Sequence, residues 1–290
     1  MIIESKFLKA EFSQKGAELI SLQDQFGAQY IWQGKENHWS NSAPVLFPIC
    51  GFLRENFFYH KNIQYFMQVH GLARNSEFTI EEQTLSKISF SLHQSTKSLQ
   101  HFPFEFKLSV TYELIDNQLK AFFTVLNSGK NTMYFSFGWH PGFALNWIPE
   151  DSIDNYYLAF PDDTNLKRRM VNSDGLLHGD LEDMHVNENK TLSLTQNSFD
   201  QRAIVLEKYP HSEISLRHII SPKSIDFKFD NFPNLTLWGQ QGANFLCIEP
   251  WNGLSDFEDH NHKLNQKPGI LKLTPTESVS ASCSVNINME

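Results

Sequence analysis

The stretch that decides the fold is QLKAFFTVLN, residues 118–127. Its residues Leu119, Ala121, Phe123 and Val125 are apolar and occupy every second position. Successive side chains of a β-strand point to opposite faces, so this alternation is typical of a strand with one buried face. The segment therefore predicts a strand over 118–127 that covers a core.

Short apolar runs of the same kind recur along the chain, and no long helical pattern competes with them. Turn residues separate the runs, as at Asp116-Asn117 and in 172–175, which reads NSDG. The further predicted strands span residues 7–12, 29–32, 77–81, 88–93, 105–114, 132–138, 191–194, 203–206, 214–218, 224–229, 236–238, 245–248 and 279–287. Many short strands at close spacing predict an all-β protein, a large antiparallel β-sandwich or barrel-like architecture. Because no linker-like tract interrupts the chain, we expect a single domain over residues 1–290.

Composition narrows the classes of partner. The 290 residues carry a formal net charge of -9, which would repel nucleic acid and anionic lipid. No stretch approaches the roughly 20 apolar residues that cross a bilayer. These features predict a soluble, cytoplasmic protein that binds neither nucleic acid nor a membrane, and favour a small-molecule substrate.

Metal and cofactor motifs are missing from the sequence. Cys50, Cys247 and Cys283 are widely spaced and form no CxxC pair, so we expect reduced, partly buried thiols. The acidic run DFEDHNH, residues 256–262, has no recognised ligand spacing and predicts a solvated loop rather than a metal site. The chain also has no GxxxxGK[ST], strand-linked GxGxxG, GxSxG or HExxH motif. We therefore expect no metal site, and the usual support for a nucleotide-binding, nicotinamide-dependent, serine-hydrolase or zinc-protease function is missing.

Two segments end an apolar strand on an ionisable residue. In FSFGWHPGF, residues 135–143, His140 follows the strand where Gly138 and Pro141 break the pleat. This histidine is either a structural residue at a strand end or a proton donor and acceptor in a cleft. In FLCIEPW, residues 245–251, Glu249 is costly to bury without a partner, so it either has a structural partner or is kept ionised for use.

A third segment, VHGLAR, residues 69–74, has His70 and Arg74 around a glycine that permits an unusual turn. Both side chains can donate hydrogen bonds to sugar hydroxyls. The alternative is that Arg74 pairs with a surface acid such as Glu77 and that His70 is a packed loop residue.

Three tryptophans lie close to these polar residues in the sequence, namely Trp139, Trp238 and Trp251. Exposed indole faces are suited to the apolar C–H faces of a pyranose. Core packing is the ordinary alternative for each of them.

These segments occur together in the order that a known family shows. They read GAELISL (16–22), YIW (30–32), APVLFPI (43–49), HGLAR (70–74), HPGF (140–143), LW (237–238), IEPW (248–251) and GLSD (253–256). The chain resembles the aldose 1-epimerase family, in its LacX-like branch, which is related to galactose mutarotases and hexose-6-phosphate mutarotases. The resemblance extends over nearly the whole sequence.

The resemblance implies a β-supersandwich, no cofactor, and a cleft for an aldose in which His140 is the general acid and Glu249 the general base. These groups would open the sugar ring at C1 and close it as the opposite anomer. The substrate implied is an aldohexose, either free or phosphorylated. A catalytically silent carbohydrate-binding protein on the same fold is the alternative, and a glycoside hydrolase or lyase would need a second carboxylate facing Glu249.

The resemblance also suggests residues that bind the substrate. His70 resembles the family's second active-site histidine, and Arg74 resembles the arginine that follows it in this branch. Arg54 is the nearest match to another arginine of the family. The family's arginine commonly follows the glycine directly, whereas here Phe52 follows Gly51. The predicted binding residues also include Trp238, through its indole face, and Asp200, which is the nearest candidate for the family's substrate-binding aspartate.

Overall fold

A computed structural model of the chain describes residues 1–35, 37–162, 166–200 and 202–289. Its larger sheet has nine strands in the order β17, β14, β19, β20, β24, β10, β9, β8 and β7. Their bounds are β17 Thr191–Ser193, β14 Tyr156–Ala159, β19 Glu213–His218, β20 Ser224–Asp230, β24 Ser278–Asn288, β10 Gln118–Asn127, β9 Phe106–Ile115, β8 Lys87–His93 and β7 Thr79–Gln83. Each pairing within this sheet is antiparallel.

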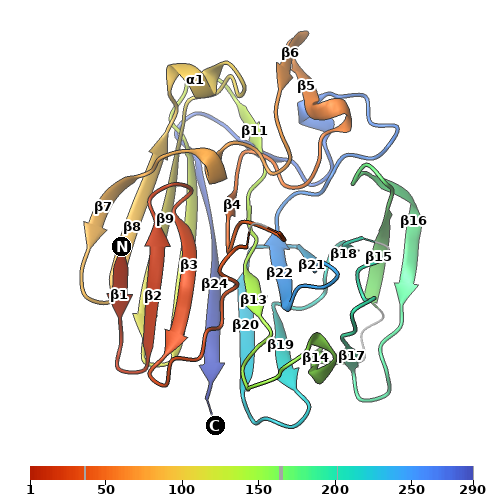
Figure 1. The fold of residues 1–290 in the computed structure, drawn as a ribbon. Coiled ribbons are helices and arrows are strands. Elements are labelled where there is room, and N and C mark those ends of the chain that lie inside the picture. Colours follow the sequence, from red (N-terminus) through yellow and green to blue (C-terminus); the bar gives the residue numbers. More distant parts are fainter. Residues whose placement is uncertain (36, 163–165, 201, 290) are drawn as a thin grey trace.

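A second large sheet has the order β16, β15, β18, β21, β22, β12 and β4, with β13 paired to β22 beside this path. Their bounds are β16 Leu177–Met184, β15 Leu166–Val171, β18 Ile204–Leu206, β21 Asn234–Trp238, β22 Phe245–Trp251, β12 Gly138–Trp139, β4 Val45–Leu46 and β13 Gly142–Ala144. Figure 1 shows β15 and β16 at the opposite side of the molecule from the N-terminal strands.

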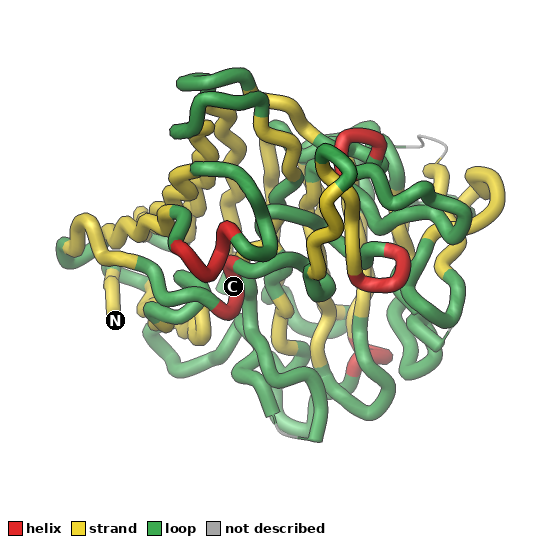
Figure 2. The backbone as a smooth tube through the Cα atoms, turned by 90° about the horizontal axis from the view of Figure 1, so that it is seen from above, coloured by secondary structure: helices red, strands yellow, loops and turns green. Residues whose placement is uncertain are grey.

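The remaining elements are small. Three further sheets contain β1 Ile2–Glu4 with β2 Leu8–Ser13 and β3 Glu18–Asp24, β11 Met133–Phe135 with β23 Leu271–Leu273, and β5 Phe57–His60 with β6 Ile63–Phe66. The helical pieces are α1 Thr96–Leu99 and the 3₁₀ turns Arg54–Asn56, Ala73–Asn75, Ile153–Asn155 and Leu264–Gln266. Strands and loops make up almost all of the chain in Figure 2. Within the described residues, no helix is long and apolar enough to cross a membrane.

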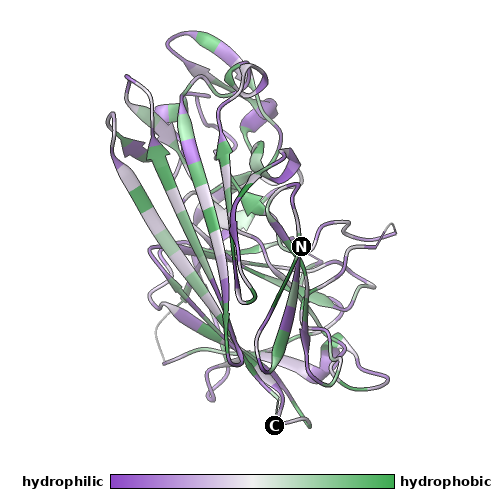
Figure 3. Cartoon of the chain, turned by 90° about the vertical axis from the view of Figure 1, so that its left-hand side faces the viewer, coloured by the Kyte–Doolittle hydropathy of each residue, from purple (hydrophilic) through white to green (hydrophobic). Residues whose placement is uncertain are grey.

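The core is built by the alternation that the sequence predicted. In β10, the side chains of Leu119, Ala121, Phe123 and Val125 are buried, whereas Phe122 on the other face is 42% exposed. The long strands in Figure 3 carry hydrophobic and hydrophilic residues in alternating bands. One continuous cluster of buried apolar side chains extends through the sequence from Ile3 to Ile287. The antiparallel all-β prediction is confirmed.

Two strand predictions need correction. Residues 29–32 form only isolated bridges, through Gln29 and Ile31, because this segment crosses between sheets rather than following one. The predicted strand over 132–138 divides into β11 and the start of β12. Strands that were not predicted include β3 and β14, together with the short strands β1, β4, β5, β6, β13 and β23. The hairpin of β15 and β16 was not predicted either, because its mostly exposed or half-buried residues give no apolar run.

All three cysteines are free, as predicted, but they are fully buried rather than partly buried. The prediction of a solvated loop over 256–262 is wrong for its first residue. The Asp256 side chain is fully buried and lies 3.0 Å from the Nζ atom of Lys267. Only the following residues of the run, such as Glu258 and Asp259, reach the surface.

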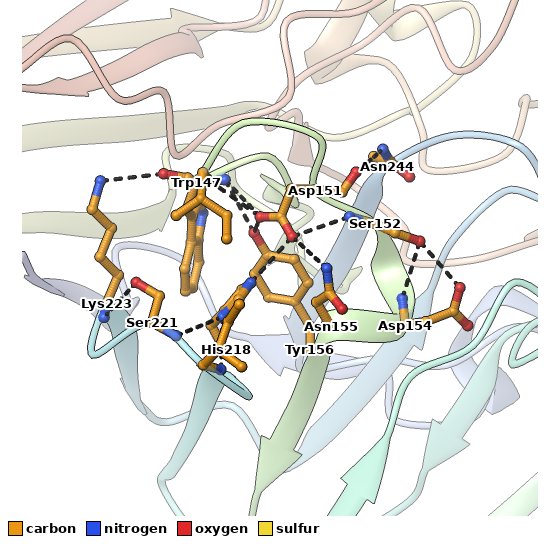
Figure 4. Close-up of polar contacts among 12 residues, drawn as sticks. Trp147, Asp151, Ser152, Asp154, Asn155, Tyr156, His218, Ser221, Lys223 and Asn244 are labelled. Atoms are coloured by element: carbon orange, nitrogen blue, oxygen red, sulfur yellow. Dashed lines mark hydrogen bonds and ion pairs between the residues drawn. The ribbon is translucent and has the colours of Figure 1, made fainter.

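A second buried carboxylate joins the loop after β13 to β19 and β22, as Figure 4 shows. The Asp151 carboxylate accepts hydrogen bonds from the Trp147 backbone N–H, Tyr156 Oη and His218 Nε2. Asn244, immediately before β22, donates to the Asp151 carbonyl at 3.3 Å. We call these five residues the Asp151 network.

Candidate functional site

Strand β22 brings Glu249 into the interior of the second sheet. Every residue of this strand is buried, and Glu249 is 1% exposed. Because strand side chains alternate, Cys247, Glu249 and Trp251 share one face. The register pairs Glu249 with Thr236 of β21, so the threonine lies beside the carboxylate.

Strand β12 places His140 on the other side of β22. Gly138 pairs with Trp251 of β22, and a Cβ at Gly138 would lie 2.7 Å from the Trp251 ring. Glycine is therefore required for the close approach of the two strands. The chain is then held by the His140 N–H, which donates to the Pro44 carbonyl at 3.1 Å.

The two predicted catalytic side chains are in contact. His140 Nε2 lies 3.2 Å from Glu249 Oε2, and the side chains are 8% and 1% exposed. Burial raises the pKa of Glu249 well above its ordinary value, and burial lowers the pKa of His140 to about 3. The pair therefore favours a neutral imidazole beside a protonated carboxyl, whereas a general base at Glu249 and a general acid at His140 act as a carboxylate and an imidazolium.

His70 approaches the pair from a strained turn. His70 and Gly71 both have positive φ, 65° and 78°, and a Cβ at Gly71 would lie 2.3 Å from the Phe47 carbonyl oxygen. Only glycine fits that position. The His70 ring lies 5.3 Å from the His140 ring, at an interplanar angle of 85°.

Arg74 reaches the same cleft from the turn Ala73–Asn75. Its Nε atom is buried and has no hydrogen-bond partner in the protein. Burial lowers the Arg74 pKa, and the nearby Glu18 acts in the opposite direction. The alternative that Arg74 pairs with Glu77 is not observed. The structure describes both residues, and no ion pair joins them.

Aromatic rings surround the histidine. Trp39 stacks on the His140 ring at 4.8 Å, and Trp238 meets it edge-on at 6.0 Å. Trp251 lies 5.5 Å from the His70 ring. Trp139 belongs to the core instead, where it is fully buried and donates to the Ala43 carbonyl. Trp39 was not predicted as a site residue, because the polar segment around it carries no periodic signal.

Together these groups line a cleft of about 360 Å³, within the usual range for small-molecule sites. The residues that line it are Trp39, Pro44, Phe52, Val69, His70, Arg74, His140, Val171, Gly175, Arg202, Ala203, Val205, Thr236, Trp238, Glu249, Trp251 and Ser255. Several buried polar atoms of this lining have no hydrogen-bond partner in the protein: His140 Nδ1, Arg74 Nε, Thr236 Oγ1, Glu249 Oε2 and Trp251 Nε1. Unpaired buried polar groups are rare in folded proteins, so this concentration indicates a site for a polar ligand.

Arginine side chains outnumber carboxylates in the described lining of the cleft. Among the residues that the structure describes, Glu249 is the only carboxylate in the lining, whereas Arg74 and the exposed Arg202 both contribute guanidinium groups. A glycoside hydrolase needs a second carboxylate roughly 5–10 Å away. The described part of the cleft therefore gives no support to that alternative.

Two predicted binding residues are not brought to the cleft. Arg54 lies beyond Phe52, where its guanidinium donates to the His260 carbonyl at 3.1 Å and lies near Glu55. Asp200 is exposed in a turn and is not part of the lining. Both predictions took the nearest match to a residue of the resembled family, and the turns after Gly51 and before β18 direct these residues elsewhere. Arg202, two residues beyond Asp200, does line the cleft.

One group of side chains has the composition of a metal site. The ligand atoms of His140, Cys247 and Glu249 lie within 4.8 Å of one another, the only such group among the described residues. Three ligands of these types resemble a catalytic zinc site. Burial, however, raises the Cys247 pKa well above its ordinary value, which disfavours the thiolate that a metal requires.

Comparisons with known proteins bear on the family and the fold of the chain. The model of the aldose 1-epimerase family matches residues 2–266. The chromosomal protein LacX of Lactococcus lactis subsp. lactis is 30% identical, over 98% of each chain. A galactose mutarotase-like protein from Lactobacillus casei is 30% identical over 99% of each chain, with a TM-score of 0.93. A galactose mutarotase related enzyme from Lactobacillus acidophilus is 28% identical, covers 99% of this chain and 97% of its own, and also has a TM-score of 0.93.

Proposed function

Because the chain belongs to the aldose 1-epimerase family, we propose that it interconverts the α and β anomers of an aldohexose, with His140 and Glu249 as its catalytic residues. The observation that carries this proposal is the contact between their side chains, with Nε2 and Oε2 3.2 Å apart. The contact lies in a cleft whose lining presents several unpaired polar atoms to a ligand.

In the proposed reaction, Glu249 removes the proton of the C1 hydroxyl and His140 protonates the ring oxygen. The C1–O5 bond then opens to give the free aldehyde. Rotation about C1–C2 exposes the other carbonyl face, and the reverse proton transfers close the ring as the opposite anomer. Each positioned proton transfer contributes roughly 10²–10⁴-fold to the rate.

Catalysis requires that the pair hold one proton in total. Burial favours the neutral arrangement with that proton on Glu249. Glu249 Oε2 and His140 Nε2 are 3.2 Å apart but are not aligned for a hydrogen bond. A small reorientation of either side chain would align them and let the proton pass to His140, which creates the carboxylate and the imidazolium that the reaction uses. Sugar hydroxyls that enter the cleft supply hydrogen bonds to these charged forms and so favour the transfer.

The other lining residues fit roles in binding. The indole of Trp238 offers an apolar face to the sugar ring, as do Trp39 and Trp251, which also line the cleft. His70 and Arg74 provide hydrogen-bond donors for hydroxyl groups.

The test is the rate of change of optical rotation of freshly dissolved α-glucose and α-galactose, with and without the protein. We expect acceleration of at least one sugar, and we expect His140→Ala to remove most of it while the circular dichroism spectrum is unchanged. Sugar binding without acceleration would instead support the silent carbohydrate-binding protein. A His140→Ala variant with the parental rate would contradict the proposed mechanism.

The charge of the lining favours a second candidate, an anomerase for a phosphorylated aldohexose. Arg202 is exposed at the cleft and forms no ion pair with any described carboxylate. The Nε atom of Arg74 has no hydrogen-bond partner among the described residues, although Glu18 lies near this side chain. Guanidinium groups bind phosphate through paired N–H donors.

NMR exchange on glucose 6-phosphate separates the two candidates. If the guanidinium groups of the cleft bind the phosphate, kcat/KM for the phosphorylated sugar exceeds that for glucose, and Arg202→Gln removes the difference. Lys208→Gln, a change at an exposed residue outside the cleft, is the control. Equal kcat/KM for both sugars would contradict the second candidate and leave the first intact.

A further inference from the structure

Behind one wall of the cleft lies a buried ion pair that the proposed chemistry does not use. Lys267 Nζ is 3.0 Å from Asp256 Oδ1, and neither side chain is exposed. The other carboxylate oxygen of Asp256 lies 3.3 Å from His260 Nδ1. Burial acts to raise the Asp256 pKa, but Lys267, His260 and the Arg54 N–H outweigh it and lower the pKa to about 2. Asp256 is therefore ionised at neutral pH. A buried ion pair often adds little to the net stability of a protein. We therefore infer the role of this pair from the groups that it contacts.

The contacts of the pair converge on the backbone of residues 52–54. Lys267 Nζ donates to the Phe52 carbonyl at 3.1 Å, and the Asp256 N–H donates to the same oxygen at 2.9 Å. The Arg54 N–H donates to Asp256 Oδ2 at 2.9 Å. The bond from Lys267 Nζ and the bond to Asp256 Oδ2 each involve a charged group, which makes these two stronger than ordinary hydrogen bonds.

The neighbouring Ser255 completes the attachment. Its Oγ accepts a hydrogen bond from the Phe52 N–H at 3.0 Å. The two segments approach so closely that a Cβ at Gly51 would lie 2.3 Å from this same oxygen. Gly51 has a φ of 67°, so both its space and its backbone conformation exclude a side chain.

Gly51 in turn holds His70 through a pair of reciprocal hydrogen bonds. The Gly51 N–H donates to His70 Nδ1 at 3.2 Å, and the His70 N–H donates to the Gly51 carbonyl at 3.0 Å. Burial, followed by the electrostatic interactions with His140, Arg74 and Lys267, holds the His70 pKa well below its ordinary value, so the ring is neutral. A neutral imidazole that accepts at Nδ1 carries its proton on Nε2.

We propose that Asp256 and Lys267 are positioning residues, which fix the Gly51–Phe52 backbone and thereby hold His70 as the Nε2–H tautomer that donates a hydrogen bond to the ligand. The inference rests on the proposed function only in taking that ligand to be a sugar. The structural part, that the pair determines the state of His70, does not depend on turnover.

The direct readout is the tautomer of His70, measured by ¹⁵N NMR of the imidazole nitrogens and assigned with His70→Gln. The parent protein shows protonated Nε2 and unprotonated Nδ1. In Lys267→Met, which keeps the chain length and removes the ammonium group, we expect a mixture of both tautomers. Asp256→Asn is a second variant, which keeps an acceptor for the Arg54 N–H and tests the same link if Lys267→Met does not fold.

Binding provides an independent readout, because tryptophan residues line the cleft and their fluorescence reports a bound sugar. For either variant we expect the dissociation constant of the sugar to rise about tenfold, as for one lost hydrogen bond between neutral groups. In an active protein KM rises similarly, and kcat falls less.

Asp151→Asn is the matched control, since it removes another buried carboxylate that contacts a histidine, in the Asp151 network of Figure 4. None of the five residues of that network lines the cleft. The control loses stability but keeps the His70 tautomer and the sugar affinity. If both Lys267→Met and Asp256→Asn behave like this control, the pair is only structural and the inference is wrong. A parent protein that shows the expected tautomer but no anomerase activity would contradict the proposed function and not this inference.

Discussion

Glu249 and His140 are buried together, and their environment predicts an unusual pH dependence. The active pair holds one proton, and a second proton can be added only when the pH falls towards the His140 pKa of about 3. We therefore expect kcat/KM to stay constant from pH 7 to about pH 5, after subtraction of the uncatalysed rate. A decline centred near pH 6.5, the value for an ordinary histidine, would contradict this account.

The buried carboxyl of Glu249 also predicts a stability effect. Its folded-state pKa is raised above the ordinary 4.5, so its protonated form favours folding fully below pH 4.5, and this contribution is lost as the pH rises through the folded pKa. Glu249→Gln does not titrate. We expect the variant to be more stable than the parent by about 1–3 kcal/mol at pH 7, measured by urea unfolding, and to lose this advantage at pH 4. An equal difference at both pH values would point to another cause.

How far the sequence predicted the site depends on the residue. His140, Glu249, His70, Arg74 and Trp238 meet in the cleft, because each stands at a strand end or turn whose glycine or proline is visible in the sequence. Trp39 and Thr236 were missed for lack of any local signal. Arg54 and Asp200 were misplaced, since the direction of a loop depends on contacts with distant segments, such as that between the Arg54 N–H and Asp256.

At the scale of elements, the Asp151 network attaches the loop after β13 to β19 and to the residue before β22. Removal of the charge of Asp151 leaves donors from Trp147, Tyr156 and His218 without a full partner. Asp151→Asn is expected to lower the free energy of unfolding by about 1–3 kcal/mol. The measurement is urea denaturation, with the exposed Asp154→Asn as the control, expected to stay within about 0.5 kcal/mol of the parent. Equal losses in the two variants would contradict a specific role for the buried carboxylate.

Strands were predictable where one face alone is buried. β10 has the bounds that its alternation predicted, because a period of two identifies a strand without knowledge of its neighbours. β15 and β16 lack that signal, since their pairing with each other extends a sheet beyond the apolar core. The segment 29–32 has strand-like composition but finds only isolated bridge partners. The local pattern of a segment thus predicts an extended conformation. Whether the segment becomes a strand depends on the partners that it finds in a sheet.

At the scale of the whole molecule, the sheets share one cluster of buried apolar side chains that includes residues from both ends of the chain. We propose on this basis that residues 1–290 form a single domain. Differential scanning calorimetry should show one transition with equal calorimetric and van't Hoff enthalpies. Two separate transitions would instead indicate two units with independent cores.

The central claim is that the buried pair of His140 and Glu249 interconverts anomers of an aldohexose. The measurement that tests it most directly is the NMR exchange rate between the α and β anomers, for the parent and for Glu249→Gln, with both proteins folded. The account predicts that the parent accelerates exchange and that the variant loses at least about 100-fold of that acceleration. A Glu249→Gln variant that exchanges the anomers at the parental rate would contradict it.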